Sequence, residues 1–342
     1  MLAQLVYDGS GDPKLHATSG TPAEGQFMGT PAEKLVEICG RECYDSFGRG
    51  RSSVEYHAHI NEVNHGSVQE HFQVTVQFIP ERWGGFKLIA RAVANRPGVW
   101  LEDATWPRIT ANLRAIREWH DNGLRKGCWE VGQAMKSVAH GLAPNIVSEP
   151  EINPDWYGSF MVAEPETDEE KWVSMFMSGS RGFSHEQVRH KWRTAVSQRS
   201  TRYVDEHESD WIVHPVVNDF FSEQGNDVIN DATLMCDRLA TAREKCQEAY
   251  KDVVDRLQAY LIDKGADKLT ARKQARGAAR GWLGNALETS MIFSASVAQW
   301  KRMIKQRANP AADGEIRTIY QDYVIPELKK SRYSDCFRNI GV

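Results

Sequence analysis

The sequence predicts an α+β protein in which a small sheet packs against several helices, with a helical insertion. Residues 72–78 alternate apolar and polar side chains, which is the period-two pattern of a half-buried strand. Most of the C-terminal half instead shows apolar residues three and four positions apart, the spacing of amphipathic helices. Hydrophobic residues make up 41% and charged residues 26%, which is the composition of a chain with a packed core.

The N-terminal part predicts a loop, two helices and the strand, in that order. Residues 10–31 are rich in Gly, Ser, Thr and Pro and therefore predict a loop. A helical face begins with Leu35 and Ile38, and residues 52–64 predict a second helix. The strand over 72–78 then follows within ten residues.

Residues 80–170 predict an insertion that is mainly helical. Apolar residues at helical spacing predict one amphipathic helix over 109–119 and another over 131–138, and a loop rich in proline and acidic residues completes the segment. We therefore expect a core formed by residues 1–79 and 171–342, with the insertion as a subdomain away from the binding site of that core.

The rest of the chain predicts a strand and then helices. Trp172 to Met177 is apolar enough for a strand, and Ser184 to Trp192 predicts a short helix. Four longer helices are expected after it, the second of them capped by Asp267: residues 226–262, 268–280, 287–307 and 312–328.

Composition also bounds the class of protein. The formal net charge is −4, so the chain lacks the overall positive field that draws proteins to nucleic acid. The six cysteines form no CxxC pair, which fits a reducing compartment, and the N-terminal residues lack the pattern of a signal peptide. No apolar stretch approaches the roughly 20 residues of a transmembrane helix. We expect a cytoplasmic protein that binds neither nucleic acid nor membranes.

One segment is strongly basic although the protein as a whole is acidic. Residues 187–204, QVRHKWRTAVSQRSTRYV, hold five Arg or Lys residues and no Asp or Glu. Guanidinium groups match the geometry of phosphate, and a hydrogen bond to a charged group contributes about 1.5–3 kcal/mol. By composition, the segment is either an anion-binding site or a solvated basic face.

The order of residues in this segment is more specific than its charge. RHKWRTAVSQRSTRY resembles the signature of flavin-dependent thymidylate synthases (ThyX), in which Arg-His-Arg is followed by seven or eight residues and Ser. Arg189 and His190 match this signature, and Lys191, which replaces the third Arg, stands eight residues before Ser200. Lysine keeps the positive charge of that position but loses the bidentate fork of arginine.

A second segment, HGSVQEH from His65 to His71, stands directly before the predicted strand and resembles the HGSVxEH motif of the same family. Together with His57 and His59 it forms a cluster of histidines that raises the alternative of a metal site. Spacings of two and six residues match no common zinc pattern, and no cysteine is suitably placed, so we predict no metal.

A third segment, residues 285–307, is similar to the C-terminal block of the family. Trp300, Lys301 and Arg307 match that block. Ser296 instead stands where Asn is common, and Ala298 stands where Arg is common. The two departures concern flavin contacts and leave Arg307 in place.

The resemblance implies a reaction and the residues that carry it. In the family, NADPH reduces FAD, methylenetetrahydrofolate supplies a one-carbon unit, and the flavin delivers the hydride that completes a methyl group on C5 of dUMP. Arg307 is implied as the catalytic residue that stabilises the anion at N3 and O4 of uracil. The residues implied in nucleotide binding are Glu186, Gln198, Ser200, Thr201, Arg202, Arg280 and Arg307. Those implied in flavin binding are His65, Ser67, Glu70, Arg189, His190, Lys191, Ser296 and Arg302. A homotetramer whose active sites draw on several subunits is also implied.

Two other functions stay open at this point. A methylase acting on UMP, as in nucleoside-antibiotic biosynthesis, would carry the same motifs, because a pocket rejects an added hydroxyl only weakly. A nucleic-acid-binding protein would use the basic segment 187–204 directly, and the net charge of −4 argues against it.

Overall fold

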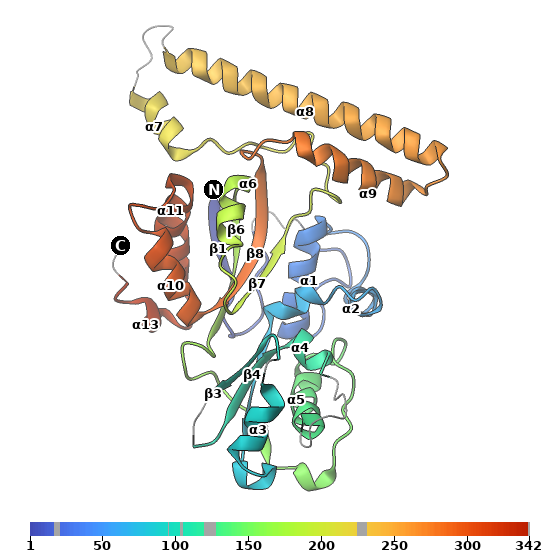
Figure 1. Ribbon diagram of the computed structural model, residues 1–342, viewed down its shortest axis with the longest axis vertical. Helices are drawn as coiled ribbons and strands as arrows, with labels where there is room; N and C mark the ends of the chain where they lie inside the picture. Colours follow the sequence, from blue (N-terminus) through green and yellow to red (C-terminus); the bar gives the residue numbers. More distant parts are fainter. Residues whose placement is uncertain (17–20, 95, 103–104, 120–127, 224–230, 341–342) are drawn as a thin grey trace.

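The computed structural model describes residues 1–342 apart from 17–20, 95, 103–104, 120–127, 224–230 and 341–342. Its described strands form two four-stranded antiparallel sheets, and helices pack around both, so the predicted α+β class is confirmed. The first sheet lies in the middle of the molecule and the second lies towards one end of its long axis (Figure 1).

The first sheet contains the longest strands. Its order is β1–β6–β8–β7, formed by β1 (Leu2–Tyr7), β6 (Trp172–Ser180), β7 (Thr194–Gln198) and β8 (Glu288–Ser296). All nine residues of β6 are buried, because this central strand is covered on both faces. The strand predicted over 172–177 is thus confirmed, whereas β1 and β7 have no counterpart among the predicted elements.

Strand β8 corrects the expectation of one helix over 287–307. It pairs with β6 along nine positions and with β7 along five, and α10 (Val297–Arg307) begins only after it. Ser296 caps α10 by accepting a hydrogen bond from the backbone N–H of Gln299 at 3.2 Å. An apolar run fits a buried strand or a buried helix equally well, and the strands on both sides of β8 decide between them.

Helices cover both faces of the first sheet (Figure 1). On one face, Met175, Met177 and Phe293 pack against α10 and the C-terminal helical segment. On the other face, Phe176 and Ile292 pack into the core that contains α1. The C-terminal segment confirms the helix predicted over 312–328 and comprises α11 (Gly314–Thr318), the π-helix η5 (Ile319–Val324) and α12 (Ile325–Leu328), followed by α13 (Ser334–Phe337).

The helices α1 (Pro31–Tyr44) and α2 (Ser53–Glu62) confirm the two predicted for the N-terminal part. A capping box starts α1: the Thr30 hydroxyl accepts from the N–H of Glu33 at 3.3 Å, and the Glu33 carboxylate accepts from the N–H of Thr30 at 3.1 Å. After α2, the 3₁₀ turn η1 (Gly66–His71) leads directly into β2.

The second sheet is built mostly from residues 80–170, which contain more helical than strand residues but supply three strands that were not expected. Its order is β3–β4–β2–β5, formed by β2 (Gln73–Phe78), β3 (Val99–Glu102), β4 (Arg108–Asn112) and β5 (Phe160–Val162). Strand β2 precedes the expected boundary at residue 80 and pairs with strands beyond it, so the sheet spans that boundary. Ile109, expected on a helix, lies in β4. The helices of this segment are η2 (Pro80–Trp83), α3 (Phe86–Val93), α4 (Leu113–Arg117), α5 (Cys128–Leu142) and η3 (Pro154–Trp156). Helix α5 confirms the helix predicted over 131–138.

Two long helices lie at the end of the molecule opposite the second sheet (Figure 1). They are α8 (Asp231–Asp263) and α9 (Lys268–Ala279), and they confirm two predicted helices, although the expected start at residue 226 lies outside the described residues. Asp267 caps α9 as predicted. The remaining elements are α6 (Arg181–Gln187), shorter than the helix predicted over 184–192, α7 (Pro215–Glu223) and η4 (Arg280–Trp282). Across the described residues, the search for a helix of membrane-spanning length and hydropathy finds none.

Candidate functional site

Arg307, the predicted catalytic residue, lies at the end of α10 and reaches α6. Its Nε donates a hydrogen bond to Nε2 of His190 at 2.9 Å, and one terminal nitrogen forms a 2.6 Å ion pair with the Glu186 carboxylate. The other terminal nitrogen donates to the backbone carbonyl of Glu186 at 3.2 Å. All three guanidinium nitrogens are therefore engaged, and residues 117 positions apart in the chain meet at one point.

This arrangement requires a neutral imidazole at His190. Because Arg307 donates to Nε2, that ring nitrogen must carry a lone pair. Burial, with the charge of Arg307 as the second cause, lowers the pKa of His190 from 6.5 to about 4. The Glu186 carboxylate also forms a 2.8 Å ion pair with the exposed Arg189, so it is shared between two guanidinium groups.

His71 fastens the turn η1 to the first sheet. The ring of His71 is fully buried, with Nδ1 2.7 Å from the Ser294 hydroxyl on β8 and Nε2 3.0 Å from the Ser197 hydroxyl on β7. The HGSVQEH motif thereby holds a fixed position beside the signature segment, residues 189–203. Within it, His65 contacts the hydroxyl of Tyr44 at 3.0 Å and Ser67 is exposed.

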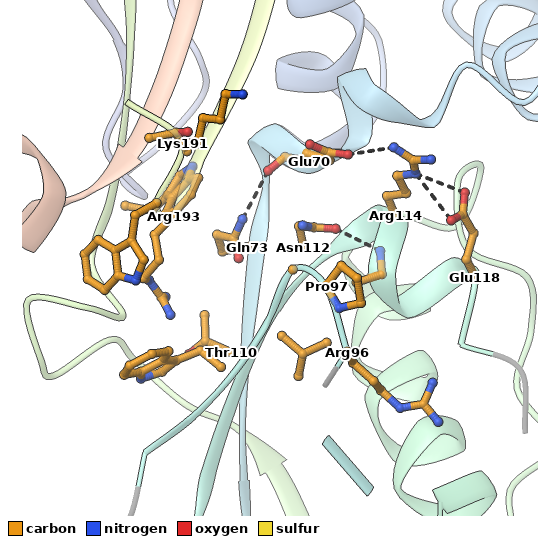
Figure 2. A pocket seen from close by; sticks show the side chains of 17 residues that line it. Glu70, Gln73, Arg96, Pro97, Thr110, Asn112, Arg114, Glu118, Lys191 and Arg193 are labelled. Carbon is orange, nitrogen blue, oxygen red and sulfur yellow. Dashed lines mark hydrogen bonds and ion pairs between the residues drawn. The ribbon is translucent and has the colours of Figure 1, made fainter. Parts of the chain in front are cut away.

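A cavity of about 590 Å³ lies between the signature segment and the second sheet (Figure 2). This volume is within the range of about 300–1,000 Å³ that small-molecule sites occupy. Glu70 and Lys191 are the predicted flavin-binding residues that line it. The other lining residues are Gln73, Arg96, Pro97, Gly98, Val99, Trp100, Thr110, Asn112, Arg114, Ala115, Glu118, Trp172, Trp192, Arg193 and Thr194.

The composition of this cavity changes the expected role of residues 80–170. In Figure 2, Lys191 and Arg193 lie on one side, and Arg114 and Glu118 lie on the opposite side. The second of these sides comes from the insertion. The insertion therefore borders the cavity that holds predicted flavin-binding residues, contrary to the expectation that it lies away from the site.

Apart from Glu186 on α6 and Arg307 on α10, the residues predicted to bind the nucleotide lie near the end of β7 and around α9. The amide of Gln198 donates to the hydroxyls of Ser184 and Thr289 at 3.1 and 3.2 Å. Ser200 follows β7, and its backbone N–H donates to the carbonyl of Cys43 at 3.0 Å. Thr201 beside it is buried.

Two predicted phosphate-binding cations are exposed in this region. Arg202 lies against α9, where its Cγ would be 3.8 Å from a Cβ built on Gly277. Arg280 lies near Arg181, whose pKa is lowered mainly by burial and further by the charge of Arg280. A site with several guanidinium groups can accept a dianionic phosphate.

Two other predicted flavin-binding residues are engaged within the protein. Ser296 is fully buried and caps α10, so its hydroxyl presents no exposed surface. The guanidinium of Arg302 lies over the ring of Trp192 at 4.1 Å.

Sequence reasoning missed the aromatic part of the cavity. The rings of Trp100 and Trp192 are 6.3 Å apart and meet edge to face, although 11 tryptophans in the chain were the only signal of such a surface. Among the described residues, no three His, Cys, Asp or Glu side chains are placed so that they could hold a metal ion.

Comparison with known proteins finds a family model that is similar to the C-terminal half of the chain. Residues 170–330 match the family model Thy1, described as thymidylate synthase complementing protein. This match spans all of the signature segment, α10 and the pair α8–α9, and it begins where the insertion ends.

Individual relatives give the same result. The chain is 35% identical over 148 residues to a flavin-dependent thymidylate synthase of Mycolicibacterium gilvum, and 36% identical over 148 residues to that of Mycolicibacterium vanbaalenii. Each alignment covers 43% of this chain and 54% of the relative, so the chain spans about half the length of the curated relatives it matches. The predicted resemblance to flavin-dependent thymidylate synthases is thereby confirmed for this part of the chain.

Among solved structures, the chain is similar to a UMP/dUMP methylase, PolB from Streptomyces cacaoi, crystallised with 5-Br UMP. The two share 13% sequence identity, and the likeness covers 48% of this chain and 70% of that one. The TM-score of the two structures is 0.33.

Proposed function

We propose that this protein methylates C5 of uracil in dUMP, with methylenetetrahydrofolate as the one-carbon donor, NADPH as the reductant and FAD as the cofactor. The observation that carries the proposal is the meeting of Glu186, His190 and Arg307 within the segment that matches the thymidylate synthase family. These residues come from two separate motifs of the resemblance, and packing brings them into hydrogen-bonding contact.

The cavity between the two sheets fits a flavin in its chemistry. Its tryptophans offer flat apolar surface, and four Arg or Lys residues against two Glu make its lining net positive in a protein of net charge −4. Lys191 is exposed at the edge of this cavity and would meet an anionic group of the cofactor. Bound FAD would supply the hydride chemistry that no amino-acid side chain provides.

Arg307 has the chemistry to activate uracil. C5 is a poor nucleophile, and it becomes stronger when the anionic form of the base is stabilised at N3 and O4. A guanidinium held in place beforehand stabilises that charge without reorganising during the reaction. Glu186 and the neutral His190 orient the group, because they accept hydrogen bonds from three different nitrogens.

The nucleotide would bind with its phosphate near the exposed Arg202 and Arg280. Ser200 contributes a polar side chain beside the base or sugar, and we assign it to binding rather than to nucleophilic attack. Gln198 and Glu186 would hold polar edges of the nucleotide through hydrogen bonds. By the family resemblance, we further propose that the protein works as a homotetramer.

The test of this function is a product assay with a matched variant pair. Protein incubated with FAD, NADPH, methylenetetrahydrofolate and dUMP should form dTMP, measured by mass spectrometry, with UMP assayed in parallel. Arg307→Ala should lower methyl transfer by about 10²–10³-fold, which is the usual effect of removing one charge-stabilising donor, and should leave FAD affinity nearly unchanged.

Lys305→Ala is the control, because Lys305 is an exposed cation on the same helix and lies outside the contacts of Arg307. Its turnover should equal that of the parent. No methylated product from dUMP or UMP would refute the proposed function, and near-normal turnover of Arg307→Ala would remove Arg307 from the mechanism. Product from UMP alone would replace dUMP as the substrate.

A further inference from the structure

The cavity described above has a wall that the family match does not include. The match covers residues 170–330. The insertion, which lies outside it, lines the cavity with Arg96 to Trp100 and with Thr110, Asn112, Arg114, Ala115 and Glu118. A ligand that fills this cavity would therefore contact a part of the chain that the matched segment does not supply.

Four side chains join this wall to the signature segment, as a pair of tryptophan rings with an arginine over each ring. Arg302 of α10 lies over the ring of Trp192 at 4.1 Å, and Trp192 meets Trp100 edge to face at 6.3 Å. Arg193 then lies over the ring of Trp100 at 4.8 Å. The two arginine contacts are favourable because a cation is attracted to the face of an aromatic ring. The edge-to-face contact of the two rings is a preferred arrangement of aromatic pairs. Trp100 thus belongs to the site although it comes from β3.

Arg193 carries two features that are costly unless they serve a site. Its backbone is in the left-handed region with φ 48°, which a long side chain seldom adopts. Its Nε is buried and has no hydrogen-bond partner among the described residues, although one terminal nitrogen donates to the backbone carbonyl of Glu169. Burial lowers the pKa of Arg193 to about 10 and leaves it charged at pH 7.

The opposite side of the cavity is polar and mostly paired. Arg114 forms ion pairs with Glu70 at 2.7 Å and with Glu118 at 3.2 Å. Asn112 lies between the two sides in Figure 2 and its side-chain oxygen caps α4. The aromatic side carries Lys191 and Arg193, and the charge of Arg193 is partly offset by the nearby carboxylates of Glu102, Glu169 and Glu170. Arg114 is instead paired directly with Glu70 and Glu118.

We infer that Trp100 and its neighbours in the insertion form a ligand-binding wall, which takes a planar heterocycle with an anionic tail. The ring would pack on Trp100, and the tail would lie towards Lys191 and Arg193. This inference rests on the proposed function, which supplies two sources of that chemistry: the carboxylates of a reduced folate, or the phosphates of a flavin or nicotinamide dinucleotide.

The test is a set of separate calorimetric titrations with FAD, NADPH and tetrahydrofolate. Trp100→Ala should weaken the binding of one probe by on the order of tenfold, as expected for loss of an aromatic platform. Trp106→Ala is the matched control, because Trp106 is also in the insertion, is 44% exposed and lies outside the cavity lining. Weakened binding of tetrahydrofolate would identify the ligand as a reduced folate with carboxylates. Weakened binding of FAD or NADPH would identify it as a dinucleotide with phosphates.

Trp100→Leu keeps apolar bulk without the ring and serves if the alanine variant does not fold, as judged by circular dichroism. If a folded Trp100 variant bound all three probes within twofold of the parent, the inference would be overturned. Such a result alongside normal dTMP formation by the parent would leave the proposed function standing. If Trp100→Ala weakened the binding of one probe selectively, while the parent formed no methylated product, the result would support the wall and reject the proposed function.

Discussion

His71 makes the stability of this protein depend on pH in a way that one substitution can isolate. The imidazole is fully buried between two serine hydroxyls, on Ser197 and Ser294, and Ser294 in turn donates to Ser174 at 2.6 Å. A neutral imidazole has one donor and one acceptor, and hydroxyls can satisfy both. Burial without a counter-charge lowers the pKa of His71 from 6.5 to about 3.

The direction of the effect follows from where the proton binds. Between pH 6.5 and about 3 the unfolded chain binds a proton at this histidine and the folded chain does not, so stability falls as the pH is lowered through that window. A pH of 5 lies about 1.5 pH units below the ordinary pKa of histidine, and protonation stabilises the unfolded state by about 1.4 kcal/mol for each of these units. His71 should therefore lower the free energy of unfolding by about 2 kcal/mol between pH 7 and pH 5.

Urea unfolding followed by tryptophan fluorescence at pH 7, 6 and 5 measures this contribution. His71→Gln should be less stable than the parent at pH 7, by about 1–3 kcal/mol for the lost hydrogen bonds, but should lose about 2 kcal/mol less on going to pH 5. His59→Gln, which changes a partly exposed histidine on α2, should keep the slope of the parent. Equal losses in His71→Gln and the parent would show that this imidazole is not held neutral by burial.

Two further predictions concern the packing of α1. A Cβ at Gly40 would overlap the hydroxyl of the buried Tyr56, so Gly40→Ala should lower stability in urea unfolding by about 1–3 kcal/mol despite the better helix propensity of alanine. Adding Tyr56→Phe should recover part of that loss, and a neutral Gly40→Ala would contradict the packing described. Arg41 is buried, pairs with Glu37 at 2.6 Å and donates to backbone carbonyls of the following loop, so Arg41→Ala should cost about 3–5 kcal/mol in thermal or urea unfolding. Exchanging both partners, as Arg41→Met with Glu37→Gln, should cost less than Arg41→Ala, and an equal or larger loss would reject the buried charge as the cause.

Local patterns in the sequence were sufficient for several elements and for the family resemblance. The helices α1 and α5 and the strand β2 were predicted because each presents one apolar face at its own period. The cap at Asp267 was equally local, since a capping side chain bonds to N–H groups two or three residues away. The motifs at 65–71 and 189–200 are contiguous, so they can be recognised without knowing what lies beside them in space.

The predicted roles of individual residues depended on more than their motifs. Arg307 and His190 were assigned separately, and tertiary structure brings them to 2.9 Å. Lys191 and Glu70 were both assigned to the flavin, and both line the cavity, whereas His65, Ser67 and Ser296 do not. A motif specifies which residues stand in a row, but the direction of each side chain depends on the element that carries it and on its neighbours.

The strand β8 and the cavity wall were decided only by tertiary structure. The apolar run before Ser296 had no period that separates strand from helix, and its pairing with β6 and β7 requires segments about 100 residues away along the chain. The same holds for Trp100 on β3 and Trp192 between α6 and β7, which meet only in the folded chain. Contacts of this kind arise from the burial of whole surfaces, and that burial leaves no pattern within a short stretch of sequence.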